Sequence, residues 1–169
     1  MKKTLTIITL LLALSFSAFS SQPVKLGHVN SQELLRLMPE LDSAEQTLQR
    51  HIREFQAEAM AMQTELENQY NEFQANQNQW SELIQRTRFR AIQDLEQRIQ
   101  EYQQTAQREL EELRTRLFEP IIEKAHEAIA QVAREHRYTY VFDTAQGVLL
   151  FSNDSDDILE LVKRKLDVK

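Results

Sequence analysis

The chain has 169 residues, 41% of them hydrophobic, with a formal net charge of −6, which is typical of one folded unit. It has only two glycines, so the clustered glycines of a phosphate-binding loop are absent, and its acidic balance argues against broad nucleic-acid binding. The absence of cysteine excludes disulfides and a cysteine nucleophile.

Residues 1–20 have the pattern of a secretory signal peptide. Lys2 and Lys3 form a basic start, residues 5–16 are an apolar run, and Ala18 and Ser20 are small residues at the positions that a signal peptidase reads. The alternative is a membrane anchor. It is less favoured because spanning a bilayer needs roughly 20 apolar residues, and this segment has only about 15. We expect export with cleavage after Ser20, which takes the net charge from −6 to −8 because two lysines leave.

Residues 21–40 predict a short strand followed by a short helix. In the segment VKLGHVN, Val24 and Leu26 would lie on one face of the strand and Val29 on the other. Asn30 followed by Glu33 has the spacing of a capping box and predicts a helix start. The helix would end or change direction at Pro39.

Two long apolar stripes follow, each narrow and flanked by Glu, Gln, Arg and Asn, which is typical of a coiled coil. The first alternates steps of four and three residues and passes through Leu41, Glu45, Leu48, Ile52, Phe55, Ala59, Met62, Leu66, Gln69, Phe73, Asn76 and Trp80. The second passes through Leu95, Ile99, Tyr102, Ala106, Leu110, Leu113, Leu117, Ile121 or Ile122, Ala125, Ile129 and Val132.

The two stripes predict an antiparallel helical hairpin over residues 41–120. A turn at residues 77–81 would bring them together, with Ser81 as the N-cap of the second helix. Pro39 and Pro120 then lie at the same level. Each arm helix would be roughly 60 Å long, and Pro120 would bend or interrupt the second helix where it leaves the hairpin.

Residues 121–169 predict the end of that helix near residues 135–137, two strands and a final helix. The strands lie in YTYVFDTAQGVLLFSN, with Gly147 at the turn between them. Residues 153–155 would cap the last helix. Its inward residues would be Ile158, Leu161, Val162 and Leu166.

Three short strands with small helices are too little to form a self-sufficient core, and exposed strand edges favour pairing between copies. We therefore predict an α+β, mainly α, protein in which a long antiparallel coiled-coil hairpin projects from a small β body formed by oligomerisation. The residues expected at the contacts between copies are Val24, Leu26, Val29, Tyr140, Phe142, Val148 and Leu150.

Some residues of the arm are candidates for binding. Phe55, Met62, Leu66 and Phe73 are interpreted as coiled-coil core, whereas Tyr70 and Phe89 fall outside the stripes and Trp80 lies at the tip. Exposed apolar groups can mark a binding surface, although single ones are common. A basic cluster just past the tip could hold anionic ligands or approach anionic lipid head groups, with a solvated arm end as the alternative. It consists of Arg86, Arg88 and Arg90.

The sequence gives little support for catalysis. Glu123 and His126 have the Glu-x-x-His spacing of di-iron helical bundles, but such sites need a second copy of the motif, and the chain has none. No Gly-x-Ser-x-Gly motif is present. We expect no catalytic residue, no metal site and no cofactor, and keep a helical-bundle metalloenzyme as the least favoured alternative.

The residues at both ends of the chain resemble one known family. The segment KLGHVNSQELLRLMPE, the long polar hairpin, and the stretch from LFEPIIEKAHEAIAQVAREHRYTYVFD to the C-terminal helix resemble the Skp/OmpH periplasmic chaperones. The C-terminal stretch, with its YxYVxD strand and acidic DDI cap, is the more specific part. The family often has glycine where this chain has Arg137.

This resemblance implies a homotrimer with a small β-barrel body and three α-hairpin tentacles around a cavity. It further implies an ATP-independent holdase in the periplasm that binds unfolded outer-membrane proteins and prevents their aggregation. The alternative from a different class is a structural coiled-coil spacer or adaptor of the cell envelope, whose arms bind a defined folded partner. In either case the basic tip could make weak contact with an anionic membrane surface.

Overall fold

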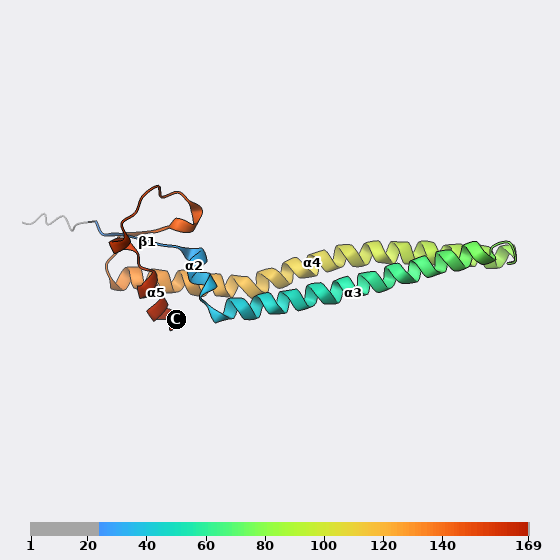
Figure 1. Cartoon of the computed structure of the whole chain (residues 1–169), viewed down its shortest axis with the longest axis horizontal. Helices are drawn as coiled ribbons and strands as arrows, with labels where there is room; N and C mark the ends of the chain where they lie inside the picture. Colours follow the sequence, from blue (N-terminus) through green and yellow to red (C-terminus); the bar gives the residue numbers. More distant parts are fainter. Residues whose placement is uncertain (1–23, 169) are drawn as a thin grey trace, which may run out of the picture.

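A computed structural model describes residues 24–168 as a long helical arm attached to a small body (Figure 1). The predicted signal peptide at residues 1–20 lies outside the described residues. The elements, in chain order, are β1 (Leu26–Val29), α2 (Ser31–Arg36), α3 (Pro39–Asn76), α4 (Glu82–Glu135), β2 (Tyr140–Asp143), the 3-10 turns η1 (Thr144–Gln146) and η2 (Asp154–Asp156), and α5 (Leu159–Leu166).

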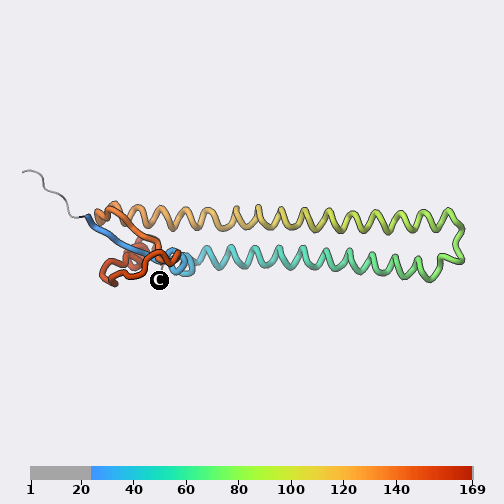
Figure 2. The backbone as a smooth tube through the Cα atoms, turned by 90° about the horizontal axis from the view of Figure 1, so that it is seen from above, coloured from blue at the N-terminus to red at the C-terminus, as the bar shows by residue number. Residues whose placement is uncertain are grey.

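Helices α3 and α4 form the arm and run antiparallel along its whole length (Figure 2). Pro39 occupies the start of α3, where the missing N–H of proline costs no helical hydrogen bond, so it begins the long helix. At the far end Ser81 caps α4, as predicted, and its Oγ accepts a hydrogen bond from the Ile84 N–H. The Gln85 side chain closes the turn by donating to the carbonyl oxygens of Gln77 and Trp80, at 2.7 and 3.1 Å.

Pro120 does not interrupt α4, which continues as helix from residue 82 to residue 135. Proline inside a helix removes one backbone hydrogen bond and costs about 3 kcal/mol. Here the helix on the C-terminal side of Pro120 is anchored to the body, because Ile121, Ala125, Ala128 and Val132 are all buried there. This burial outweighs the local penalty, since each buried aliphatic side chain contributes about 1–3 kcal/mol.

The sheet of the body has two parallel strands. β1 pairs with β2 in a register that runs from Leu26 opposite Tyr140 to Val29 opposite Asp143, so the entire arm is the connection between them. On its other edge, β1 meets residues just before α5, where the His28 carbonyl accepts a hydrogen bond from the Ile158 N–H at 2.9 Å. Segments from both ends of the chain therefore close the body.

The predicted third strand, which begins at Val148, is not formed in the single chain. The residues after Gly147 are irregular, and Val148, Leu150 and Phe151 are 75%, 100% and 85% exposed. The backbone before this segment turns it away from the sheet. Residues 144–146 form the 3-10 turn η1, and Gly147 directly after it adopts a left-handed conformation (φ +66°).

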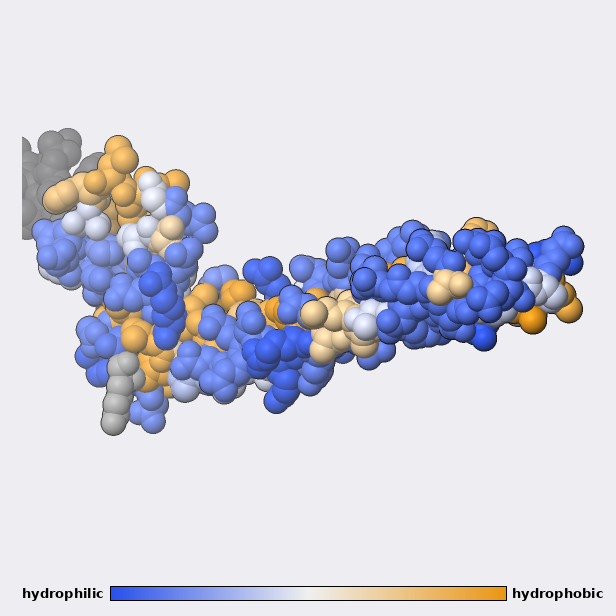
Figure 3. Space-filling model, turned by 45° about the vertical axis from the view of Figure 1, so that its right-hand side comes forward, coloured by the Kyte–Doolittle hydropathy of each residue, from blue (hydrophilic) through white to orange (hydrophobic). Residues whose placement is uncertain are grey.

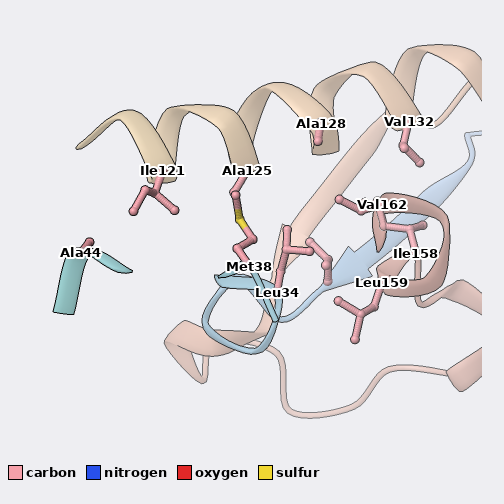
Figure 4. Packing of buried hydrophobic residues seen from close by; sticks show 11 residues of the cluster. Leu34, Met38, Ala44, Ile121, Ala125, Ala128, Val132, Ile158, Leu159 and Val162 are labelled. Atoms are coloured by element: carbon pink, nitrogen blue, oxygen red, sulfur yellow. The ribbon is translucent and has the colours of Figure 1, made fainter. Parts of the chain in front are cut away.

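The core of the body lies between α4 on one side and α2, β1 and α5 on the other (Figure 4). Its most deeply buried side chains are Val29, Leu34, Met38, Val132, Ile158 and Val162. Val29 is only 2% exposed, so in the single chain it belongs to the internal core, unlike the other six residues predicted at the contacts between copies. On the other face of β1, Leu26 is 48% exposed, whereas His28 is buried at 9%.

The C-terminal helix begins later than predicted. Asn153 caps η2, accepting a hydrogen bond from the Ser155 N–H at 3.1 Å, and α5 starts at Leu159. The Asp157 side chain accepts a hydrogen bond from the Leu159 N–H at 2.8 Å, so an acidic residue still stabilises the N-terminus of this helix. Among the predicted inward residues, Ile158 and Val162 are fully buried, while Leu161 and Leu166 are partly buried against the core.

The arm has a second, smaller core. It is formed by Leu66, Ile92, Leu95 and Ile99, with Met62 and Phe73 packed against it. At the base of α3 the buried residue is Ala44, not the neighbouring Glu45 of the predicted stripe, because Ala44 also lies one turn after Leu41 and has no charge to desolvate. Within residues 24–168, no helix has the length and hydrophobicity that crossing a bilayer requires.

Candidate functional site

The tip of the arm carries an aromatic cluster that joins α3, the turn and α4. The Phe73 ring lies 6.0 Å from the Trp80 ring, nearly edge to face, and 6.1 Å from the Phe89 ring. Trp80 is partly buried by these contacts, and Phe89 remains 47% exposed. Aromatic pairs in this arrangement are worth about 0.5–1.5 kcal/mol beyond their burial. Of the two predicted binding residues here, Phe89 offers the larger accessible surface.

Tyr70, the third predicted binding residue, is engaged within the arm. Its hydroxyl donates to Oε1 of Glu96 at 2.7 Å and so bridges α3 and α4. This hydrogen bond to the carboxylate raises the pKa of Tyr70 above its ordinary value. The residue as a whole is still 36% exposed, so Tyr70 remains partly accessible to a ligand.

The three arginines of the predicted basic cluster differ in their contacts. The Arg88 guanidinium lies 3.6 Å from the Glu72 carboxylate and 5.7 Å from the centre of the Trp80 ring, so it is part of the tip structure. Arg86 and Arg90 are exposed, and within the described part of the chain neither forms an ion pair. The positive charge available to a ligand therefore comes mainly from Arg86 and Arg90.

Two apolar residues in the first turn of α4 escaped the sequence analysis. Leu83 is 69% exposed and Ile84 is 44% exposed, next to the tip turn. Both residues lie between the end of the first predicted stripe and the start of the second. An apolar residue that belongs to neither stripe has no partner helix to cover it, and this could have predicted their exposure. Figure 3 shows apolar surface at this far end of an otherwise hydrophilic outer arm. The tip thus combines exposed aliphatic groups with free positive charge.

A larger apolar surface lies on the body. Six of the seven predicted contact residues are exposed in the single chain, with Tyr140 at 60% and Phe142 at 42%; the others are Val24, Leu26, Val148 and Leu150. The Tyr140 and Phe142 rings lie side by side with centroids 6.4 Å apart, and Leu26 pairs with Tyr140 across the sheet. Figure 3 shows apolar atoms gathered on this part of the body. We call these six residues and Phe151 the exposed body face.

Polar contacts hold the arm to the body. Lys124 on α4 pairs with Glu40 in the first turn of α3, and this contact lowers the pKa of Glu40. Lys165 on α5 pairs with Glu135 at the end of α4, at 2.6 Å, and lowers the pKa of Glu135. Exposed ion pairs contribute little individually, at about 0–1 kcal/mol. The continuous helix α4 and the core of the body therefore contribute more to the junction than these pairs do.

The residues with metal-binding potential are dispersed in the described part of the chain. Residues 24–168 contain no group of three or more His, Cys, Asp and Glu side chains able to hold a metal ion. Glu123 and His126, the pair with the di-iron spacing, are both exposed on α4. The surfaces that the structure offers for binding are the tip and the exposed body face.

Comparison with known proteins identifies the relatives of this chain. A crystal structure of a candidate outer membrane chaperone (OmpH-like) from Caulobacter crescentus CB15 superimposes with a TM-score of 0.74 at 18% sequence identity, covering 85% of this chain and 84% of that one. This likeness establishes the fold. The search of curated proteins finds no match. The model of the family described as outer membrane protein (OmpH-like) matches residues 25–166, and the chain therefore belongs to the OmpH-like family.

Proposed function

We propose that this protein is an ATP-independent holdase chaperone of the periplasm, which binds unfolded outer-membrane proteins and prevents their aggregation. Membership of the OmpH-like family and the description of the Caulobacter structure as a candidate chaperone support this proposal. The physical need is clear. An unfolded β-barrel precursor exposes apolar surface and unpaired strand edges, so it aggregates in water.

The observation that carries the proposal is the arm itself. α3 and the facing part of α4 extend for 38 residues, about 57 Å, away from the only compact part of the described chain (Figure 2). Such an arm provides a large accessible surface for contacts with a client, and it contributes little to the hydrophobic core of the body. Arms from several copies would enclose a space in which many weak contacts add up, so that one client is retained and other chains are kept away.

The exposed body face supports assembly into a homotrimer with a shared β-barrel body. Tyr140, Phe142 and Leu150 would each lose apolar exposure to water if copies met there, at about 25 cal/mol per Å². The irregular residues after Gly147, which lack a strand partner in one chain, would gain one from a neighbouring copy. The proposed number of three copies comes from the family resemblance of the sequence.

The tip supports a weaker, second contact, with an anionic membrane surface. Arg86 and Arg90 supply charge for lipid head groups, at about 1 kcal/mol each near the surface, and the aliphatic Leu83 and Ile84 lie next to them. Two charges give marginal binding for one arm. Several tips on one oligomer would increase it through multivalency.

Aggregation of a client separates the chaperone from the alternative, a structural spacer or adaptor. A urea-unfolded outer-membrane β-barrel protein is diluted into buffer and its light scattering is followed with and without the mature protein, in the absence of ATP. The holdase keeps scattering low at one oligomer per client. Unchanged aggregation at that ratio, with the oligomer intact, would favour the spacer.

A further inference from the structure

The seam between α3 and α4 is open in the middle of the arm. Between Ala44 and Leu66 on α3, and between Ile99 and Ile121 on α4, no side chain is fully buried. Toward the base the seam is closed by the body core, and toward the tip by the cluster around Leu95. The two helices therefore pack tightly at two levels and leave the level between them accessible.

A groove of about 340 Å³ lies at this open level. Phe55 and Tyr102 form one part of its wall, with their rings edge to face and centroids 6.3 Å apart. Each helix also contributes an alanine, Ala59 and Ala106, whose methyl groups fill less of the seam than the isoleucines and leucines of the closed levels. The remaining apolar lining comes from Ile52 and Leu110. We call this the mid-arm groove.

The polar residues that line the mid-arm groove are uncharged amides, Gln56, Gln103 and Gln107. A glutamine amide both donates and accepts hydrogen bonds, which are the contacts that a peptide backbone requires. Burial raises the pKa of Tyr102, and the nearby carboxylates of Glu58 and Glu109 raise it further. The groove thus has an apolar floor, a neutral hydrogen-bonding rim and two carboxylates close to Tyr102.

We propose that the mid-arm groove binds extended segments of unfolded polypeptide, with apolar side chains seated between α3 and α4 and the backbone hydrogen-bonded to the glutamines. The proposal rests on the holdase function and assigns a contact site to it. From Ile52 to Ala59 the helix rises about 10 Å, the length of about three extended residues. The first and third of these point to the same side, which matches the alternating apolar pattern of a membrane β-strand.

The carboxylates of Glu58 and Glu109 near the groove favour an unfolded peptide over lipid head groups, nucleic acids or a second arm. Lipid head groups and nucleic acids bring phosphates, which Glu58 and Glu109 would repel. A second copy of the arm brings the same excess of negative charge, since the whole chain has a net charge of −6. A neutral or basic peptide segment meets neither obstacle. The groove and the basic tip would therefore serve chemically different ligands.

The experiment fills the groove and measures peptide binding directly. In the full mature protein, Ala59→Leu and Ala106→Leu are combined, and the matched control combines Ala61→Leu with Ala91→Leu on exposed helix faces. The probe is a short fluorescein-labelled peptide in which leucine alternates with threonine, followed by anisotropy. We expect about tenfold weaker binding for the filled groove, because one apolar side chain loses its burial, and unchanged binding for the control.

Equal peptide affinity of the filled-groove variant and the wild type would overturn the proposal, and so would a wild type that does not bind the peptide. Wild-type binding that the filling abolishes, together with no suppression of client aggregation, would keep the groove and reject the holdase function. An association of copies that is lost on filling the groove would assign the groove to a second arm and also overturn the proposal.

A second measurement applies if the filled variant loses helical structure. The chain has no cysteine, so Gln56→Cys introduces a single attachment point for a benzophenone at the rim of the groove. Asn68→Cys, exposed on the same helix, is the control. Irradiation should cross-link the peptide several times more efficiently from residue 56 than from residue 68. Equal yields would place the peptide elsewhere and overturn the proposal.

Discussion

Ser31 donates its hydroxyl to Oδ2 of Asp143 at 2.6 Å and its backbone N–H to Oδ1 at 3.1 Å. The same carboxylate accepts from the Ala145 N–H at 2.9 Å. One side chain at the end of β2 thus holds the start of α2 and the turn η1, which are separated by the whole arm. Burial alone would raise the pKa of Asp143, but the hydrogen bonds from Ser31 and Ala145 outweigh it and lower the pKa.

This contact predicts a pH-dependent stability term. Because the pKa of Asp143 is lower in the folded chain, its ionised form stabilises the fold above the unfolded pKa of about 3.9, and this contribution is lost as the pH falls through the folded value. Asp143→Asn should lower the free energy of unfolding by about 1–2 kcal/mol at pH 7, and by much less near pH 2. Urea unfolding followed by circular dichroism at both pH values measures the difference. A penalty of the same size at both would contradict the assignment.

The second prediction concerns the end of α4. Arg137 has φ +59°, a left-handed conformation that is costly for a residue with a Cβ, and it stands where the family often has glycine. Arg137→Gly should therefore raise the free energy of unfolding by about 0.5–1 kcal/mol. As a control, Arg134→Gly in the last turn of the helix should lower it by a similar amount. Thermal unfolding of the two variants tests the pair, and a destabilising Arg137→Gly would show that its side chain outweighs the backbone strain.

The third prediction concerns the close approach of β1 to Tyr138. A Cβ added at Gly27 would lie 2.9 Å from Cε1 of Tyr138 and 3.2 Å from Cγ2 of Ile158. The Tyr138 ring packs against the core of the body and lies 4.0 Å from the Lys25 ammonium, so moving it away would disrupt both contacts. Gly27→Ala should destabilise the protein by about 1–3 kcal/mol. The cost should fall when Gly27→Ala is made in a Tyr138→Ala background, and an unchanged cost would locate the strain elsewhere.

The fourth prediction tests the exposed body face as the surface between copies. Leu150 and Phe151 are exposed in the single chain, so Leu150→Glu with Phe151→Glu should leave the fold of one chain intact. Light scattering coupled to size exclusion should show the molar mass falling toward that of one chain, because burying two carboxylates in an interface is costly. Met60→Glu, on a 71% exposed residue of α3, is the control and should leave the mass unchanged. If the double variant keeps the oligomeric mass, the copies are joined by another surface.

The fifth prediction tests the tip. Arg86→Gln combined with Arg90→Gln should weaken binding to vesicles that contain anionic lipid, and the loss should be largest at low salt. Arg50→Gln with Arg53→Gln removes the same charge from the exposed side of α3 and should have a smaller effect. Trp80 is the only tryptophan of the chain, so its fluorescence reports on the tip during the titration. Equal effects of the two pairs would mean that net charge, rather than the tip, determines binding.

The sequence is a good guide to the helical parts because they depend on local signals. The alternating steps of three and four predict two long helices, and Ser81, a residue able to cap, marks the start of the second. The strand around Leu26 and the strand around Phe142 also form, and Gly147 lies in a turn as predicted, where it adopts a left-handed conformation. In each case a few neighbouring residues determine the conformation.

The sequence fails where distant segments compete. Val148 to Phe151 has the composition of a strand, but after the 3-10 turn η1 and the left-handed Gly147 it pairs with neither β1 nor β2. Val29 looks suitable for a surface between copies until α2 and α5 close over it. For the candidate site, the sequence finds the arginines of the tip but not that Arg88 is engaged by Glu72, nor that Leu83 and Ile84 are exposed beside them.

By itself, the sequence determined the long helices, their turn and their amphipathic stripes, because helix formation and capping depend on residues within one or two turns. Only the tertiary structure decided which levels of the seam close and which remain open, since this depends on the side chains that two helices bring face to face. Leu95 and Ile99 meet Leu66 and exclude water, whereas Ala59 and Ala106 leave a groove. Two stripes that look alike in the sequence thus form both a core and a candidate binding surface.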